Sequence, residues 1–412
     1  MDIKAELPID EQNFRKLING NMIYVDKTEI IKRILDLKRT YHFLSRPRRF
    51  RKSLLVSMLK ELAENEFDIK LKAEFSNDKL RELIDNINKN TGEEVVVLID
   101  EYDKPILDNI NNKEIAIKIR DEVLKDFYGI LKSNSSKLKF VFVTGITEFS
   151  KVSIFSEFNN LKDLTLKEEY STICGYTHEE LEKYFKKFII NHDHLENISY
   201  EETLNKIKNH YDGYSWDGKN FLYNPFSITN FFDDDEFKNY WFKTGTPNFL
   251  VKIFEKNFNI NNIYNPLTIY ESDLDTFDIE NFKQIQLLFQ SGYLTIVKKE
   301  TINGEIVYTL KIPNFEVETS ITRNLLENFY TKTENNFRVK RKEILSQLKE
   351  GKCDLFVKYL KKEIMGIHYQ LKIRSWKYYQ TLVYFTIKGL DIQVEGEVGM
   401  FSGRMDKRKR IL

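Results

Sequence analysis

The chain has 412 residues, of which 41% are hydrophobic and 31% are charged, and its 64 Lys and Arg balance 63 Asp and Glu to leave a net charge of +1. Low hydrophobicity combined with high net charge is absent, which excludes a disordered chain. A nucleic-acid partner would require a local basic patch, because the chain is not basic overall. Cys174 and Cys353 lie far apart in the sequence, which argues against a disulfide framework or a cysteine zinc site.

No stretch of the chain approaches the roughly 18 apolar residues that a membrane helix requires. The segment Met1–Pro8 has no apolar region of the kind found in a secretory leader. We therefore expect no membrane partner and a cytoplasmic location.

The first part of the chain alternates helix and strand patterns, which predicts an α/β fold with a parallel sheet. Helices are expected at about Thr28–Leu37, in the segment after Ser53, and at about Asp78–Lys89 and Lys113–Lys132. Short apolar or β-branched runs predict strands at Tyr41–Leu44, Val95–Ile99 and Leu138–Val143.

The pattern changes near Glu168 to helices separated by aromatic-rich loops. A helix at about Glu280–Gln290, followed by two β-rich runs around Asn303-Gly304, resembles a winged-helix unit with a type I′ hairpin turn. Three further segments follow: a charged helix at Lys340–Leu348, a helix at Tyr378–Leu390 and a strand at Asp391–Val398.

Two segments carry the residues of a nucleotide-hydrolysing site. Lys52-Ser53 opens a helix after a basic turn, where a Walker A lysine would neutralise phosphates and the hydroxyl would bind Mg²⁺. Asp100-Glu101 ends an aliphatic strand, as in a Walker B motif, so that Asp100 would hold Mg²⁺ and Glu101 would polarise water. We expect the two motifs to meet at the carboxyl ends of neighbouring strands, with Thr144 as a sensor.

The Walker A pattern GxxxxGK[ST] is imperfect, because Arg46 and Arg51 stand at its two glycine positions. An arginine that must adopt a positive φ costs about 1–2 kcal/mol. The Arg51 side chain would either fill the phosphate space or contact a phosphate. The alternative is a surface basic turn beside an ordinary buried strand, with Asp100 and Glu101 as turn residues. Asp103 is expected to be either an N-cap or turn residue or a ligand.

Ten segments, in chain order, carry a wider resemblance: Leu7–Ile9, Tyr24–Thr28, Phe43–Leu54, Val95–Leu107, Phe140–Phe155, Cys174–Thr177, Tyr211–Tyr214, Tyr223–Ile228, Asn239–Leu250 and Ser291–Leu294. On these segments the chain resembles the AAA-ATPase-like proteins that carry a C-terminal PD-(D/E)xK nuclease-like domain. The resemblance implies a P-loop domain at 1–165, a helical lid with a winged-helix-like hairpin at 166–335, and a truncated α+β nuclease-like segment at 336–412.

The resemblance also implies ATP and Mg²⁺ as ligands, with Glu101 catalytic and with Ser53 and Asp100 at the metal. An arginine at position 46 is usual in this family. Asp406 would be the remnant of the nuclease site. The implied nucleotide-binding residues are Arg46, Arg49, Phe50, Arg51, Lys52, Ser53, Leu54 and Thr144.

The chain departs from the family at four points: Arg51 replaces glycine, the stretch from Met58 to Asp78 is short, Trp376 replaces a glutamate, and no E-x-K strand follows Asp406. One carboxylate cannot assemble a site of about three ligands, so we expect a truncated, inactive nuclease-like segment. We expect ATP binding with weak or lost hydrolysis.

Two alternatives remain open. A non-enzymatic protein could bind nucleic acid through Arg46–Lys52, where five of seven residues are basic. A decayed family remnant would expose unpaired strand edges and be poorly soluble. AAA-like domains often form rings, so a homo-oligomer is a further expectation. The aromatic residues of the lid, among them Trp216 and Trp241, are expected to pack the lid against the sheet.

Overall fold

The computed structural model describes residues 6–66, 77–110, 112–148, 161–243, 266–274, 284–321, 343–348, 350–358, 361, 398–400 and 403–405. Two compact units divide the chain, one formed by Met1–Thr244 with Asn265–Phe315 and the other by Gly245–Tyr264 with Glu316–Leu412. The first unit contains the sheet and the candidate site.

A four-stranded parallel sheet in the order β2-β3-β1-β4 forms the centre of the first unit. Its strands are β1 (Tyr41–Ser45), β2 (Val95–Ile99), β3 (Leu138–Gly145) and β4 (Lys162–Asp163). The α/β prediction is confirmed, and β2 has the predicted bounds. The expectation that the strands before Lys52 and before Asp100 are neighbours is wrong, because β3 lies between β1 and β2 and pairs with both.

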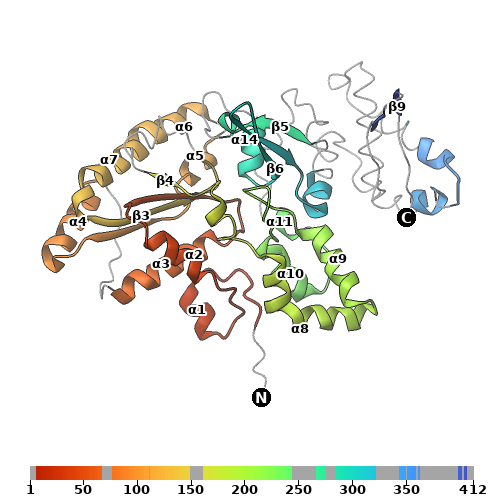
Figure 1. Cartoon of the computed structure of the whole chain (residues 1–412), viewed down its shortest axis with the longest axis horizontal. Coiled ribbons are helices and arrows are strands. Elements are labelled where there is room, and N and C mark those ends of the chain that lie inside the picture. The colour runs from red at the N-terminus through yellow and green to blue at the C-terminus, as the bar shows by residue number, and fades with distance from the viewer. Residues whose placement is uncertain are drawn as a thin grey trace. The chain divides into compact units, whose positions relative to one another are not determined.

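Helices flank this sheet on two sides, with α6 and α7 above it and α2 and α3 below it in Figure 1. Because both faces of the sheet are covered, β2 is aliphatic throughout, and Phe43, Leu44 and Val141 in the two central strands are fully buried. The helices are α1 (Phe14–Asn19), α2 (Thr28–Leu35), α3 (Lys52–Glu66), α4 (Asn77–Thr91), α5 (Lys104–Asp108), α6 (Lys113–Lys118) and α7 (Lys125–Ser133), with a π-helical turn at Ile119–Leu124.

The region after Glu168 is mainly helical, as predicted, and consists of α8 (His178–Glu196), α9 (Tyr200–Tyr211), α10 (Pro225–Asp234) and α11 (Tyr240–Lys243). It is called the lid below as a label, and its function as a lid stays a prediction. Polar caps begin these helices: Thr177 and Glu180 form a capping box on α8, and Ser199 caps α9. Their apolar faces share one core, which includes Phe185, Ile207 and Phe231.

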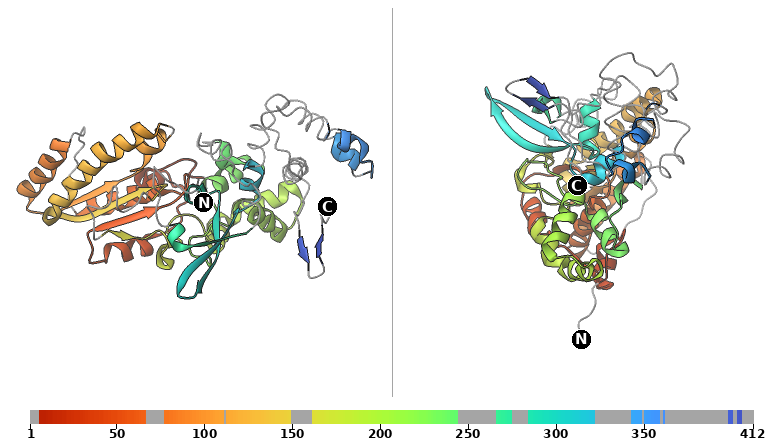
Figure 2. Two further views of the ribbon diagram at one scale, coloured as in Figure 1. Left: turned by 90° about the horizontal axis from the view of Figure 1, so that it is seen from above. Right: turned by 90° about the vertical axis from the view of Figure 1, so that its right-hand side faces the viewer.

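A second, antiparallel sheet in the order β5-β7-β6 follows, formed by β5 (Leu267–Tyr270), β6 (Thr295–Ile302) and β7 (Glu305–Lys311). The helix α14 (Gln284–Gln290) precedes β6. Figure 2 shows β6 and β7 as a long hairpin. Asn303 and Gly304 have φ of 53° and 84°, so the predicted hairpin turn is confirmed. The likeness to a winged helix stays a prediction.

In the second unit, a short helix at 343–348 buries Ile344, and β8 (Val398–Met400) pairs with β9 (Gly403–Met405). Trp376, Asp406, the predicted helix Tyr378–Leu390 and most of the predicted strand Asp391–Val398 lie outside the described residues. Within the described ranges, none of the helices has the length and apolar character needed to cross a membrane.

Candidate functional site

The loop Arg46–Arg51, here called the β1–α3 loop, connects the central strand β1 to the first turn of the 15-residue helix α3. Arg49 and Arg51 have φ of 67° and 61°, so both adopt the left-handed conformation. That conformation costs about 1–2 kcal/mol for a residue with a Cβ. At position 51 the chain therefore has the backbone conformation for which a glycine is normally used.

Arg46 is fully buried at the start of the loop. Its guanidinium donates to the carbonyl oxygens of Ser45 at 2.8 Å, Thr165 at 3.0 Å and Tyr170 at 3.0 Å. It also stacks on the ring of Trp216, 4.1 Å from the ring centroid. The side chain thus connects the loop to the beginning of the lid. Its direct contact with nucleotide stays a prediction.

The middle of the loop is also held by lid residues. The buried ring of Phe50 makes edge contacts with Tyr214 and Trp216 at centroid distances of 4.8 and 5.3 Å. The indole of Trp241 donates to the carbonyl oxygen of Arg48 at 3.2 Å. The expectation that these aromatic residues pack the lid against the sheet domain is confirmed, and the loop itself is the surface that they contact.

The two left-handed arginines contact the N-terminal segment. Arg51 donates to the Pro8 carbonyl oxygen at 3.2 Å, and Arg49 forms an ion pair with Asp10. Arg51 also lies 5.5 Å from the Tyr176 ring centroid. These contacts offset part of the free-energy cost of the left-handed backbone. Arg46, Arg48 and Phe50 likewise contact residues that are distant in the sequence. The sequence analysis did not find Pro8 or Asp10, although Leu7–Ile9 was among the family segments.

Lys52 begins α3 and is buried, and its ammonium donates to the Pro47 carbonyl oxygen at 2.9 Å. Burial lowers the pKa of Lys52, while the nearby carboxylates of Asp103, Asp100 and Glu101 oppose that shift. The two predicted motifs therefore come together at one edge of the sheet. Ser53 is half-buried beside Lys52, and Leu54 is buried in the same first turn.

The acidic turn after β2 has a specific local structure. Asp100 accepts a hydrogen bond from the Glu101 amide at 2.9 Å. Glu101 is exposed and has a φ of 51°, a conformation that costs free energy for a residue with a side chain. Glu101 is therefore a strained, exposed carboxylate beside the half-buried Asp100, and its catalytic role stays a prediction.

Asp103 is a third carboxylate of the site, which the sequence alone left undecided. One of its oxygens accepts three hydrogen bonds, from the Ile146 amide at 2.9 Å, the Thr147 amide at 2.6 Å and the Thr147 hydroxyl at 2.7 Å. Among the described residues, its other oxygen is buried without a hydrogen-bond partner. Burial raises the pKa of Asp103. Asp103 therefore fixes the loop after β3 to the turn after β2, rather than serving as a simple cap.

Thr144 lies at the end of β3, opposite Leu44 of β1. It is fully buried, and its hydroxyl donates to the Leu44 carbonyl oxygen at 2.8 Å. Thr144 is therefore close to the β1–α3 loop, and its role as a sensor stays a prediction.

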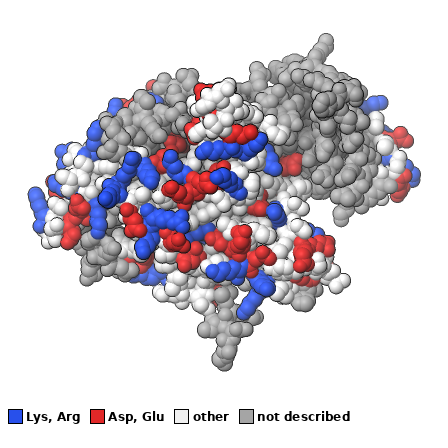
Figure 3. Space-filling view, in the orientation of Figure 1, with Lys and Arg blue, Asp and Glu red and all other residues white. Residues whose placement is uncertain are grey.

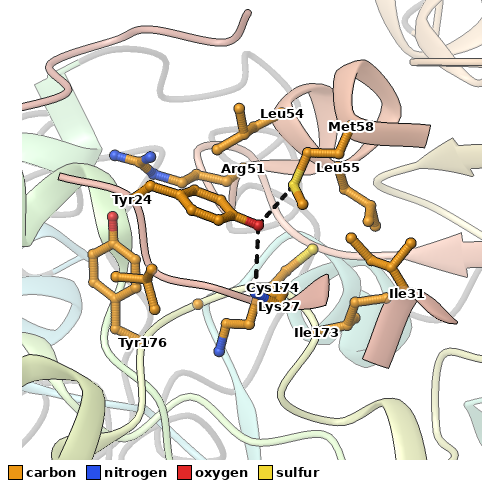
Figure 4. Close-up of a pocket in the computed structure, with 12 residues that line it drawn as sticks. Tyr24, Lys27, Ile31, Arg51, Leu54, Leu55, Met58, Ile173, Cys174 and Tyr176 are labelled. Carbon is orange, nitrogen blue, oxygen red and sulfur yellow. Dashed lines mark hydrogen bonds between the residues drawn. The ribbon is translucent and has the colours of Figure 1, made fainter. Parts of the chain in front are cut away.

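A small pocket with a cavity volume of about 30 Å³ adjoins the first turns of α3 and is partly open to solvent. Figure 4 shows Tyr24 across it, with its hydroxyl 3.3 Å from the Met58 sulfur and 3.4 Å from the Lys27 amide. Arg51 and Tyr176 lie on one side, and the aliphatic walls come from α2, α3 and the segment before α8. The pocket is therefore narrow, and its lining is mainly apolar and aromatic, with Lys27 and Arg51 as the charged members.

Comparison with known proteins identifies the family of this chain. The model of a family of predicted AAA-ATPases matches residues 8–75 and 61–155, which include the central sheet through β3 and the β1–α3 loop. A protein of Azotobacter chroococcum mcd 1, named "Uncharacterized protein in vnfD 5'region", is 34% identical over 375 residues, covering 78% of this chain and 70% of that protein. The chain belongs to this AAA-ATPase-like family. No solved structure matches the chain.

In this AAA-ATPase-like chain, the basic run Arg46–Lys52 does not form a surface patch. Arg46 and Lys52 are buried, Arg49 and Arg51 are partly buried, and Arg48 is the exposed member. Figure 3 shows acidic and basic side chains interspersed over the face in view. The structure therefore offers no support for nucleic-acid binding through this run.

Among the described residues, no group of three or more His, Cys, Asp and Glu side chains is arranged to hold a metal ion. Mg²⁺ at nucleotide sites takes only one or two protein ligands and completes its shell with phosphate and water. The Ser53 hydroxyl and the Asp100 carboxylate fit that limited donor set, and the acidic groups near Lys52 suit a site for a cation beside phosphates.

Proposed function

We propose that the protein binds ATP and Mg²⁺ at the β1–α3 loop. The observation that carries this proposal is the left-handed backbone of Arg51 immediately before Lys52 and the start of α3. Amide groups at a helix N-terminus, a buried lysine and nearby carboxylates together favour a phosphate chain with its metal ion.

Each residue then has a defined part. Lys52 would leave the Pro47 carbonyl oxygen and contact the phosphates, while Ser53 and Asp100 would hold Mg²⁺, which neutralises phosphate charge when bound. Glu101 would orient water. The pocket beside Tyr24 and Leu54 would have to widen to take the base, for which its apolar and aromatic walls are chemically suited.

We propose that hydrolysis is weak or lost. Position 51 normally lets the backbone approach the phosphates closely, and here it carries a Cβ and a guanidinium. The contacts of Arg51 with Pro8 and Tyr176 keep the backbone left-handed, but they do not remove that bulk.

Thermal unfolding with and without Mg-ATP tests the binding proposal. A ligand at about 100 times its Kd stabilises the native state by about 2.7 kcal/mol, so the wild type should melt measurably higher with ATP. Lys52→Ala should lose this rise, whereas Lys60→Ala, an exposed lysine of the same helix, should keep it. An equal rise in wild type and Lys52→Ala would contradict the proposal.

Phosphate release under the same conditions tests hydrolysis. We expect a low rate that falls further in Glu101→Gln and rises in Arg51→Gly, because glycine adopts the required φ without a side chain. A fast wild-type reaction that Arg51→Gly does not change would refute the part assigned to Arg51.

A further inference from the structure

A short turn far along the chain packs directly against the β1–α3 loop. Gly292 lies between α14 and β6 with a φ of 90°, and a Cβ added there would come within 2.9 Å of the Pro47 Cβ. The same Cβ would lie 3.4 Å from the Trp241 ring. The turn therefore follows the ring of Pro47 with no space between them.

Trp241 completes this contact from the lid. Its indole donates to the Arg48 carbonyl oxygen at 3.2 Å, and its ring lies 5.0 Å from the ring of Tyr293 in the turn. Trp241 is buried. One side chain thus touches both the loop and the turn.

Two other contacts connect the same regions. The Ser215 amide donates to the Thr295 hydroxyl at 2.6 Å, and the adjacent Trp216 stacks on Arg46. The amide of Glu148, in the loop after β3, donates to the Gln290 side chain at 3.3 Å. The beginning of β6 is therefore linked to the β1–α3 loop, and the end of α14 is linked to the loop that follows β3.

Lys52 makes this arrangement responsive to a ligand. Its ammonium is bound to the carbonyl oxygen of Pro47, the residue whose ring packs on Gly292. An anion that draws Lys52 away removes a charged hydrogen-bond donor from the Pro47 carbonyl oxygen. Because Pro47 and the Gly292 turn are closely packed, a shift of Pro47 must also displace the turn.

We propose that Trp241 and the Gly292 turn are positioning residues for the β1–α3 loop and that they transmit its nucleotide state to the β5-β7-β6 sheet. The inference rests on the proposed ATP binding. Coupling of this kind is reciprocal, so a change that disturbs the turn must alter ATP affinity, and ATP must alter the dynamics of the sheet.

Matched glycine variants test the first half. Gly292→Ala and Gly304→Ala both place a side chain at a positive φ in the same region, but a Cβ at Gly304 meets nothing within 4 Å. Coupling of ordinary size predicts an ATP affinity at least about 5-fold weaker for Gly292→Ala. Gly304→Ala should bind ATP as the wild type does, by equilibrium dialysis with labelled ATP.

Trp241→Phe keeps a ring but removes the hydrogen bond to Arg48, and it serves if Gly292→Ala does not fold. We expect a weaker ATP affinity, by up to about 10-fold, because the loop loses the free energy of one hydrogen bond that holds it in place. Circular dichroism would establish that both variants are folded.

Hydrogen exchange tests the second half, because a purely structural role would not respond to ATP. Amides of residues 295–311 should exchange at a different rate with Mg-ATP in the wild type, and this difference should vanish in Lys52→Ala. Unchanged exchange, or wild-type affinity in both Gly292→Ala and Trp241→Phe, would overturn the inference while leaving ATP binding intact. Absence of ATP binding by the wild type would overturn the proposed function and the inference together.

Discussion

Replacing Arg46 should destabilise the first unit more than any exposed arginine does. Three carbonyl oxygens within 3.0 Å accept from its guanidinium, and Trp216 stacks on it. Hydrogen bonds to a charged group contribute about 1.5–3 kcal/mol each. Removing the guanidinium from water on folding offsets several kcal/mol of that sum. We expect a net loss of about 3–5 kcal/mol in the free energy of unfolding for Arg46→Ala.

The assay is urea unfolding without nucleotide, followed by circular dichroism. Arg46→Lys keeps the charge but not the planar fork that reaches several carbonyls, so its loss should be intermediate. Arg48→Ala removes an exposed charge from the same loop and should change stability by less than about 0.5 kcal/mol. A loss below about 1 kcal/mol for Arg46→Ala would refute the reasoning, because the contacts would then do no more than offset desolvation.

Two further changes probe the sheet. Burial lowers the pKa of His42 from 6.5 to about 4, so the native state takes up its proton later than the unfolded state and stability falls as pH decreases through that window. In urea titrations, His42 should cost the wild type about 2 kcal/mol of stability between about pH 7 and 5. His42→Phe, which preserves stacking on Phe140, should not show this loss. Gly145→Ala would place a Cβ 2.5 Å from Asp103 and should cost about 1–3 kcal/mol, whereas Gly129→Ala, with nothing within 4 Å, should be neutral or stabilising. Equal stabilities for the two alanine variants, or equal acid sensitivity in wild type and His42→Phe, would contradict these expectations.

Local pattern was sufficient for the elements that carry the site. Val95–Ile99 was predicted with its observed bounds because five consecutive aliphatic residues suit a strand covered on both faces. The helix after Ser53 and the hairpin around Asn303-Gly304 also follow from periodicity and turn chemistry. These features depend on residues close together in the sequence.

The order of the strands in the sheet could not be predicted from local residue pattern. The prediction placed the strand before Lys52 beside the strand before Asp100, whereas β3 lies between them. Residue pattern specifies that a strand is buried but not which strand it pairs with, since that depends on contacts between distant segments. The intervening β3 places Thr144 beside Leu44 of β1 and, through Thr147 in the loop that follows it, contacts Asp103 in the turn after β2.

The partners of the β1–α3 loop were equally hidden, because they lie 43 residues away in the case of Pro8 and 193 in the case of Trp241. Aromatic segments of the lid signalled packing, but nothing in their spacing indicated that the loop was their target. Arg46 occupies a glycine position of the Walker A pattern and is usual in the family, but its place as a connection between the loop and the lid is visible only in the structure.

A phosphate loop built on glycine adopts positive φ at little cost, so its conformation depends mainly on its own residues. This loop pays about 1–2 kcal/mol at each of Arg49 and Arg51, and the compensation comes from the N-terminal segment and the lid. Its conformation is consequently conditional on those segments being in place. The conformation of such a loop responds to its neighbours. A movement of the N-terminal segment removes the contacts of Arg49 and Arg51, and a movement of the Gly292 turn removes its packing on Pro47.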